Sequence, residues 1–205
     1  SPNHALVVPF MKEGVNLQGL PYATSYWETE TEELQAWNLV KGILEDESVE
    51  KCAQNAFYDT WHLKTQVDIH VKPVSFDTML AAGLINSEFP KGLWFLTSLY
   101  TDDPFWEDEH ETLGKARWEY NAKDVMTTFA IWQKQKEELN EIGLTGFYNR
   151  LPMPLLPCLV RASVAGVRFD KAERDRLLKE ATRLCKEETE KLRAITGNDI
   201  NPNSH

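Results

Sequence analysis

Carboxylates that could hold a catalytic metal are densest near the start of the chain. Residues 27–37 read WETETEELQAW, and Glu28-Thr29-Glu30 sets two acids around one residue. Many nucleases hold a metal with such an acid-x-acid pair, since Mg²⁺ prefers oxygen ligands. The stretch also suits a helix start: Thr29 followed by Glu32 fits a capping box, with Thr31 as an alternative cap, and acids in a first turn complement the helix dipole. We favour the helix start, because it accounts for the whole cluster.

Sparser groups further along could do the same chemistry. Asn55 and Asp59 lie in NAFYDTW (55–61), directly after a predicted strand, and open α/β sheets place their ligands beyond strand ends. Asp59 could equally favour the first turn of a helix through the dipole. Tyr120 and Asp124 are four residues apart, so on a helix they share one face. There a phenol and a carboxylate could orient a water and bind a metal, although this spacing also arises by chance.

The elements that must position these groups are predicted from hydrophobic periodicity and from capping residues. We predict strands over 5–10 and 49–54, and a turn plus a short strand over 164–170. Predicted helices start near Thr31, Asn55, Asp77, Gly92, Gly114 and Asp170, the last ending at Gly197. LPMPLLP (151–157), with three prolines, predicts a boundary. The order indicates an α/β fold with too few strands for a complete sheet, as if cut at its front.

Composition restricts the class of protein more than its partner. The 205 residues carry a net charge of -10, which by itself argues against nucleic acid; nucleases nevertheless need carboxylates, so the partner stays open. No apolar run approaches the roughly 20 residues of a membrane span. The three cysteines are odd in number and far apart, which indicates reduced thiols and a cytoplasmic protein. The five histidines form no pair at zinc-ligand spacing.

Taken together and in this order, the motifs around Asp59 and Tyr120/Asp124 resemble the second and third motifs of DEDD-type 3′–5′ exonucleases with tyrosine in the third. EDESVEKCAQNAFYDTWHL, SFDTMLAAGLIN, LTSLYTDDPFWEDE and WEYNAKDVMTTFAIW look like consecutive segments of the proofreading domain of family A (DNA polymerase I-like) DNA polymerases. The loop YTDDPFW is most similar to bacteriophage-type members. LPMPLLPCLVRASVAGVRFD resembles the passage into the polymerase domain, and the helix after it looks like the start of the thumb.

The resemblance implies a fold and a division of the chain. The fold would be α/β and RNase H-like, an incomplete mixed sheet with flanking helices. Residues 1–150 would form a partial exonuclease domain, and residues 151–205 the first segment of the polymerase domain. In this family four carboxylates hold two Mg²⁺ or Mn²⁺ ions, about 3.5–4 Å apart in the general two-metal scheme. The partners implied are the single-stranded 3′ end of DNA and the rest of the polymerase chain.

The resemblance also implies roles for single residues. Asp59 and Asp124 match the second- and third-motif aspartates and would hold metal. Tyr120 matches the tyrosine that positions the attacking water, and Asn55 matches the asparagine near the terminal nucleotide.

Two loop aromatics, Phe105 and Trp106, could stack on unpaired bases. We favour simple packing within their loop.

One motif of the family is missing. The first motif, Asp-x-Glu on the first strand, has no match, because residues 1–10 match the third strand. We therefore expect a chain truncated at both ends, weak metal binding and little or no activity in isolation. An exposed strand edge would invite self-association. A non-catalytic, single-strand-binding module is the alternative. An exoribonuclease of the same superfamily fits less well, because residues 151–205 look like polymerase.

Overall fold

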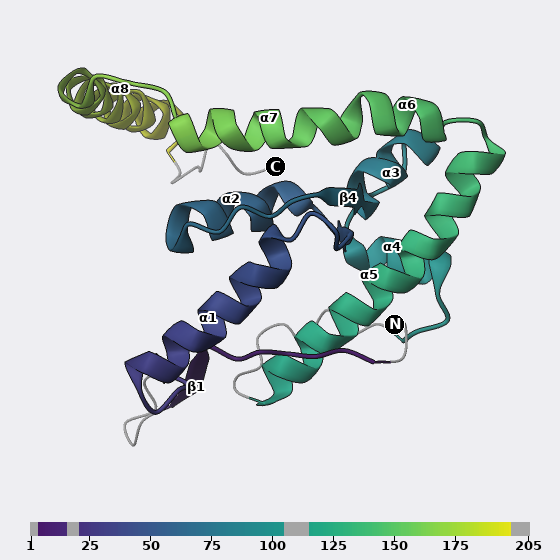
Figure 1. Cartoon of the computed structure of the whole chain (residues 1–205). Coiled ribbons are helices and arrows are strands. Elements are labelled where there is room, and N and C mark those ends of the chain that lie inside the picture. The colour runs from purple at the N-terminus through teal and green to yellow at the C-terminus, as the bar shows by residue number, and fades with distance from the viewer. Residues whose placement is uncertain (1–3, 16–20, 105–114, 198–205) are drawn as a thin grey trace. The chain divides into compact units, whose positions relative to one another are not determined.

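The chain divides into two compact units, Ser1–Ala165 and Gly166–His205. The computed structural model describes residues 4–15, 21–104 and 115–197 (Figure 1). Every proposed metal, catalytic and substrate-binding residue lies in the first unit. Phe105 and Trp106 lie outside the described residues, so their predicted roles stay predictions. Within the described ranges, no helix is long and apolar enough to cross a bilayer.

The first unit opens with a hairpin and a helix. Strands β1 (Met11–Val15) and β2 (Pro21–Ser25) pair antiparallel, and helix α1 runs over Glu30–Glu45. The predicted helix start is confirmed at Thr29. Its side chain accepts the Glu32 N–H at 3.2 Å, while the Glu32 carboxylate accepts the Thr29 N–H at 3.1 Å. Glu28-Thr29-Glu30 is thus the start of α1, as its spacing predicts.

The predicted strand over 5–10 is wrong, because these residues form no regular structure and the strand begins at Met11. Pro9 supplies no N–H for a ladder. Phe10 instead stacks on Trp37 of α1, with ring centroids 3.8 Å apart. Only the end of the apolar run packs on a helix in this way, since Leu6 is 89% exposed, and among the described residues the one ladder-like bond of the run is the Tyr26 N–H donating to the Phe10 carbonyl at 3.0 Å.

The middle of the unit is a parallel strand pair with helices leading from it. Strand β3 (Lys51–Ala53) leads into helix α2 (Ala56–Val67), and β4 (Val74–Asp77) into α3 (Thr78–Ile85). β3 and β4 pair in parallel. Helix α4 follows over Leu93–Tyr100. In the described ranges the strands form two separate two-stranded sheets, one antiparallel and one parallel, where we predicted a single mixed sheet.

The end of the unit is entirely helical. Helix α5 (Lys115–Glu141) is followed by α6 (Thr145–Arg150) and α7 (Pro152–Ala165). The boundary predicted from LPMPLLP lies inside a helical stretch, because Pro152 and Pro154 occupy a first turn in which helical N–H groups have no partner anyway. Only Pro157 lies within the helix interior. The proposed division at 150/151 stays a prediction, and α7 falls in the first compact unit.

The second unit contains one long helix. Helix α8 runs over Lys171–Thr196. Asp170 caps it by accepting the N–H groups of Ala172 and Glu173, and Gly197 ends it at φ 69°, a left-handed conformation that glycine adopts without strain. Both ends agree with the prediction. The short strand predicted over 164–170 is absent, since α7 continues to Ala165 and residues 166–170 are irregular.

Two buried clusters hold the first unit together. The larger gathers side chains from α2, β4, α3, α5, α6 and α7, among them Phe76, Leu139, Tyr148 and Leu156. The smaller joins α3, α4 and α5 through Ala82, Leu96, Tyr100 and Ile131. Figure 1 shows α7 running beside α2, and α5 passing alongside α4. This packing sets β3, α2 and α5 around the predicted site.

Candidate active site

The start of α2 carries two of the predicted site residues and has an uncommon cap. Asn55 occupies the N-cap position in a left-handed conformation (φ 57°, ψ 50°), which asparagine tolerates better than most residues, and its side chain caps nothing. The Ala56 N–H instead donates to Asp77 Oδ2 at 2.7 Å, from the end of β4. The N-terminus of α2 is therefore capped by Asp77 of the neighbouring strand and not by its own N-cap residue.

Asp77 caps a second helix at the same time. Its Oδ1 accepts the Met79 N–H at 2.8 Å and the Leu80 N–H at 3.1 Å at the start of α3. Its own backbone N–H donates to the Tyr148 hydroxyl at 2.7 Å, and that hydroxyl donates to the Asp77 carbonyl at 3.0 Å. Only 1% of Asp77 is exposed. Burial raises the pKa of this carboxyl, and the backbone N–H groups around it act in the opposite direction.

Sequence reasoning found Asp77 as the cap of α3 and missed its bond to α2. A signal for the second role was available: Asp77 and Asn55-Ala56 both follow strands at their carboxyl ends. In a parallel pair these ends meet at one edge, so an acid after one strand can reach the helix that follows the other. The double cap fixes the start of α2, and with it the first helical turn, which carries Asp59.

Asp59 lies in the first turn of α2. Its side chain is exposed overall, yet neighbouring protein atoms partly desolvate the carboxyl, and this burial raises its pKa. The charge of Asp77 raises the pKa further, and His62 lowers it. A carboxylate that is desolvated and repelled by another carboxylate is stabilised by a nearby cation. This environment suits a metal ligand.

Asp124 meets Asp59 at one cavity. The cavity has a volume of about 360 Å³ and is bordered by the end of β3, by α2 and by α5. Asp59 and Asp124 both line it, and they are joined there by polar side chains that the sequence analysis did not single out: His4, Gln54 and Thr128. No spacing pattern marks these three residues, so only the fold reveals them.

Two predicted residues do not line the cavity. Tyr120 lies four residues before Asp124 on α5, so the predicted shared helix is present, but its side chain is not among the cavity walls. Asn55 stays at the start of α2, half-buried. The two aspartates thus line one cavity. Tyr120 lies on α5 with Asp124, and Asn55 lies at the start of α2, which carries Asp59.

The donor set fits part of a divalent metal site. Two carboxylates at one cavity offer the oxygen ligands that Mg²⁺ and Mn²⁺ accept. Among the described residues, no group of three or more His, Cys, Asp or Glu side chains gathers closely enough to hold an ion. Asp59 and Asp124 could therefore contribute to such a centre as a pair.

Comparison with known proteins points to one family. Residues 19–140 match a family model described as a 3′–5′ exonuclease. A DNA polymerase I of Rhizobium leguminosarum is 32% identical over 160 residues, covering 67% of this chain and 15% of that protein. The solved POL domain of Pol1 from M. smegmatis, in complex with DNA primer-template and dNTP, aligns with a TM-score of 0.60 at 18% identity, covering 93% of this chain and 31% of that one. The last match establishes a shared fold.

Proposed function

The chain belongs to the 3′–5′ exonuclease family of family A DNA polymerases, and we propose from this premise that it forms much of a proofreading domain. The reaction is hydrolysis of the phosphodiester bond that joins the 3′-terminal nucleotide of DNA. The observation that carries the proposal is the meeting of Asp59 and Asp124, from α2 and α5, at one cavity. These two acids belong to the motifs that resemble the second and third exonuclease motifs.

Each residue has a part in the proposed reaction. Asp59 and Asp124 would hold divalent metal, which when bound would supply Lewis acidity and an activated water. Tyr120, on the same helix as Asp124, positions the attacking water. Asn55, at the start of α2, contacts the terminal nucleotide. The raised pKa of Asp59 is consistent with this role, because a bound cation would favour the charged carboxylate and so offset both its burial and its repulsion by Asp77.

The chain taken alone is proposed to be a poor nuclease. The two-metal scheme of this family uses four carboxylates, and the described cavity brings together two, Asp59 and Asp124. Two carboxylates bind Mg²⁺ weakly, since this ion dehydrates reluctantly. Aligned with 15% of its polymerase relative, the chain is proposed to work with the rest of a polymerase.

The remaining assignments extend the same proposal. Residues 151–205 form the first segment of the polymerase domain, with α8 at the start of the thumb. The partner is the single-stranded 3′ end of DNA. The proposed location is cytoplasmic, because the three separated cysteines are typical of reduced thiols. Self-association of the isolated chain would use an exposed strand edge.

The test combines metal binding with digestion. Mn²⁺ binding is measured by isothermal titration, and digestion with a 5′-labelled single-stranded oligonucleotide in Mg²⁺ or Mn²⁺. We expect weak Mn²⁺ binding that Asp59→Ala and Asp124→Ala both reduce. Glu30→Ala, which removes an acid from the start of α1, is the matched control and should change nothing. Digestion should be far slower than that of an intact proofreading domain.

Three outcomes contradict parts of the proposal. Rapid digestion that disappears in Asp124→Ala would show that the chain alone is competent. Loss of metal binding in Glu30→Ala would show that the acidic cluster at the helix start takes part. Tight oligonucleotide binding that needs no metal and leads to no digestion would favour the non-catalytic module.

A further inference from the structure

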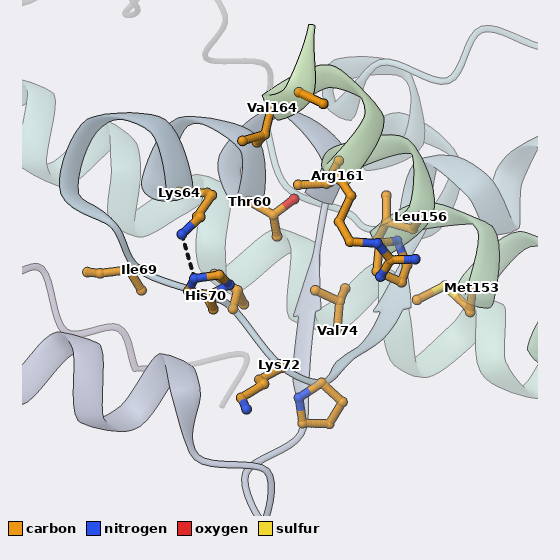
Figure 2. Close-up of a pocket in the computed structure, with 15 residues that line it drawn as sticks. Thr60, Lys64, Ile69, His70, Lys72, Val74, Met153, Leu156, Arg161 and Val164 are labelled. Atoms are coloured by element: carbon orange, nitrogen blue, oxygen red, sulfur yellow. Dashed lines mark hydrogen bonds between the residues drawn. The ribbon is translucent and has the colours of Figure 1, made fainter.

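A second and larger cavity lies away from the two aspartates. It is a groove of about 520 Å³ between α2, the segment 69–74 and α7 (Figure 2). This volume falls in the range of about 300–1,000 Å³ that is typical of ligand sites. Aliphatic side chains form most of its walls, among them Ile69, Val74, Met153, Leu156 and Val160. The groove can therefore take up apolar groups from a partner.

The charged lining of the groove has a single sign. Its titratable side chains are Lys64, His70, Lys72 and Arg161, and no acidic residue lines it. This contrasts with the chain as a whole, which carries a net charge of -10. Asp68 and Glu47, just outside the lining, pair with Lys64 and Lys72, so the positive charge that remains for an anionic partner is that of Arg161.

The four basic groups are not equally available to a partner. Lys64 pairs with Asp68 on α2, and Lys72 with Glu47 at 2.9 Å. Lys64 also lies 2.6 Å from the Nε2 atom of His70 (Figure 2).

Arg161 differs from these three. Within the described part of the chain it has no acidic partner, and its Nη2 contacts the Cys158 sulfur at 3.2 Å. Figure 2 shows Arg161 extending from α7 beside Leu156. A guanidinium presents a planar fork of donors that matches a carboxylate in a bidentate pair. Arg161 is therefore the anchor that the groove offers to an anion.

We propose that the groove binds an acidic peptide segment of a partner protein, with aliphatic side chains in the groove and a carboxylate on Arg161. The aliphatic walls suit apolar side chains, and the Arg161 guanidinium, which has no acidic partner among the described residues, suits a carboxylate. A nucleic acid fits less well, because no Phe, Tyr or Trp lines the groove, and the imidazole of His70, which does line it, is already in contact with Lys64. The inference does not depend on the exonuclease reaction, since the groove shares no lining residue with the cavity of Asp59 and Asp124.

Binding is tested with a fluorescein-labelled peptide, Glu-Leu-Asp-Leu-Ile-Asp, titrated with the full 205-residue chain and followed by fluorescence anisotropy. We expect saturable binding that weakens with added salt. Arg161→Glu should raise Kd about tenfold or more, which corresponds to about 1.4 kcal/mol. Arg150→Glu, the same charge change at the end of α6 and outside the groove, should leave Kd nearly unchanged.

A second pair of variants tests the apolar walls. Val160→Gln places a polar group in the groove and should weaken binding, whereas Leu159→Gln, at the adjacent position outside the lining, should not. Circular dichroism and thermal melts establish that each variant is folded, and a peptide with lysine at each acidic position should not bind.

Several results would overturn the proposal. One is an equal effect of Arg161→Glu and Arg150→Glu, and another is equal binding of the lysine peptide. Binding of oligothymidylate that Arg161→Glu abolishes, with no binding of the acidic peptide, would assign the groove to nucleic acid. A dimer in sedimentation that Arg161→Glu dissociates would assign it to a second copy of this chain.

Discussion

Replacing Asp77 by alanine should destabilise the first unit more than the loss of an ordinary helix cap. One carboxylate accepts three backbone N–H groups, those of Met79 and Leu80 in α3 and that of Ala56 in α2. An N-cap aspartate is worth about 0.5–2 kcal/mol. Leaving the buried Ala56 N–H without a partner adds about 1–3 kcal/mol.

Part of this cost is offset, because burial raises the pKa of Asp77 and so disfavours its charged form. We expect Asp77→Ala to lower the free energy of unfolding by about 2–4 kcal/mol, near the sum of the cap and the unsatisfied N–H. Asp77→Asn should lie between this variant and the wild type. Its single side-chain oxygen can still cap α3, but its NH₂ group then faces the Ala56 N–H, which is also a donor.

The assay is urea unfolding at neutral pH, joined to amide hydrogen exchange at Ala56. Thr29→Ala is the control, because it removes an exposed capping box with no second helix attached, and should cost about 1 kcal/mol. Exchange at Ala56 should quicken in both Asp77 variants and stay unchanged in Thr29→Ala. If Asp77→Ala costs no more than Thr29→Ala, the double cap does not stabilise the unit as argued.

Two further perturbations test single features of the same unit. Asp59→Asn should raise the free energy of unfolding at pH 7 by less than about 1 kcal/mol, since the side chain is exposed and its charge is screened by solvent. Folding raises the pKa of Asp59, so its charged form lowers the stability of the folded protein at pH values above that pKa. The gain from Asp59→Asn should therefore vanish in thermal melts at a pH below the unfolded pKa of about 3.9, where the aspartate is protonated in both states. A gain that persists there would have another cause. Pro157→Ala should stabilise the unit by about 2 kcal/mol, from about 3 for a proline within a helix less about 1 for the looser unfolded chain. Urea unfolding measures this, and a loss of stability would show that the proline ring packs usefully in α7.

Helix caps and helix ends could be predicted from the sequence without knowledge of the fold. The capping box at Thr29 and the caps at Asp77 and Asp170 each depend on residues two or three positions apart. Gly197 ends α8 because glycine adopts a left-handed conformation easily. The helices that these signals predict are present, and the motifs around Asp59 and Asp124 identified the family.

Features that depend on distant partners were misread or missed. The apolar run over 5–10 suggested a strand, but regular pairing begins only at Met11, and Phe10 places its ring on Trp37 of α1. Strands β2 and β4 were not predicted, because a short strand is specified by its pairing more than by its composition. The prolines of α7 suggested a break, but two of them fall where a helix needs no N–H.

The sequence by itself determined the family and the ends of several helices, and it singled out Asp59 and Asp124 as candidate site residues, because these signals follow from short-range spacing. Only the tertiary structure decided which groups meet. The parallel pairing of β3 and β4 brings the Asp77 carboxylate to the start of α2, 21 residues back along the chain. The packing of α5 beside these strands brings Asp124 to the cavity of Asp59. Such meetings depend on burial of a common core, which no short segment of sequence encodes alone.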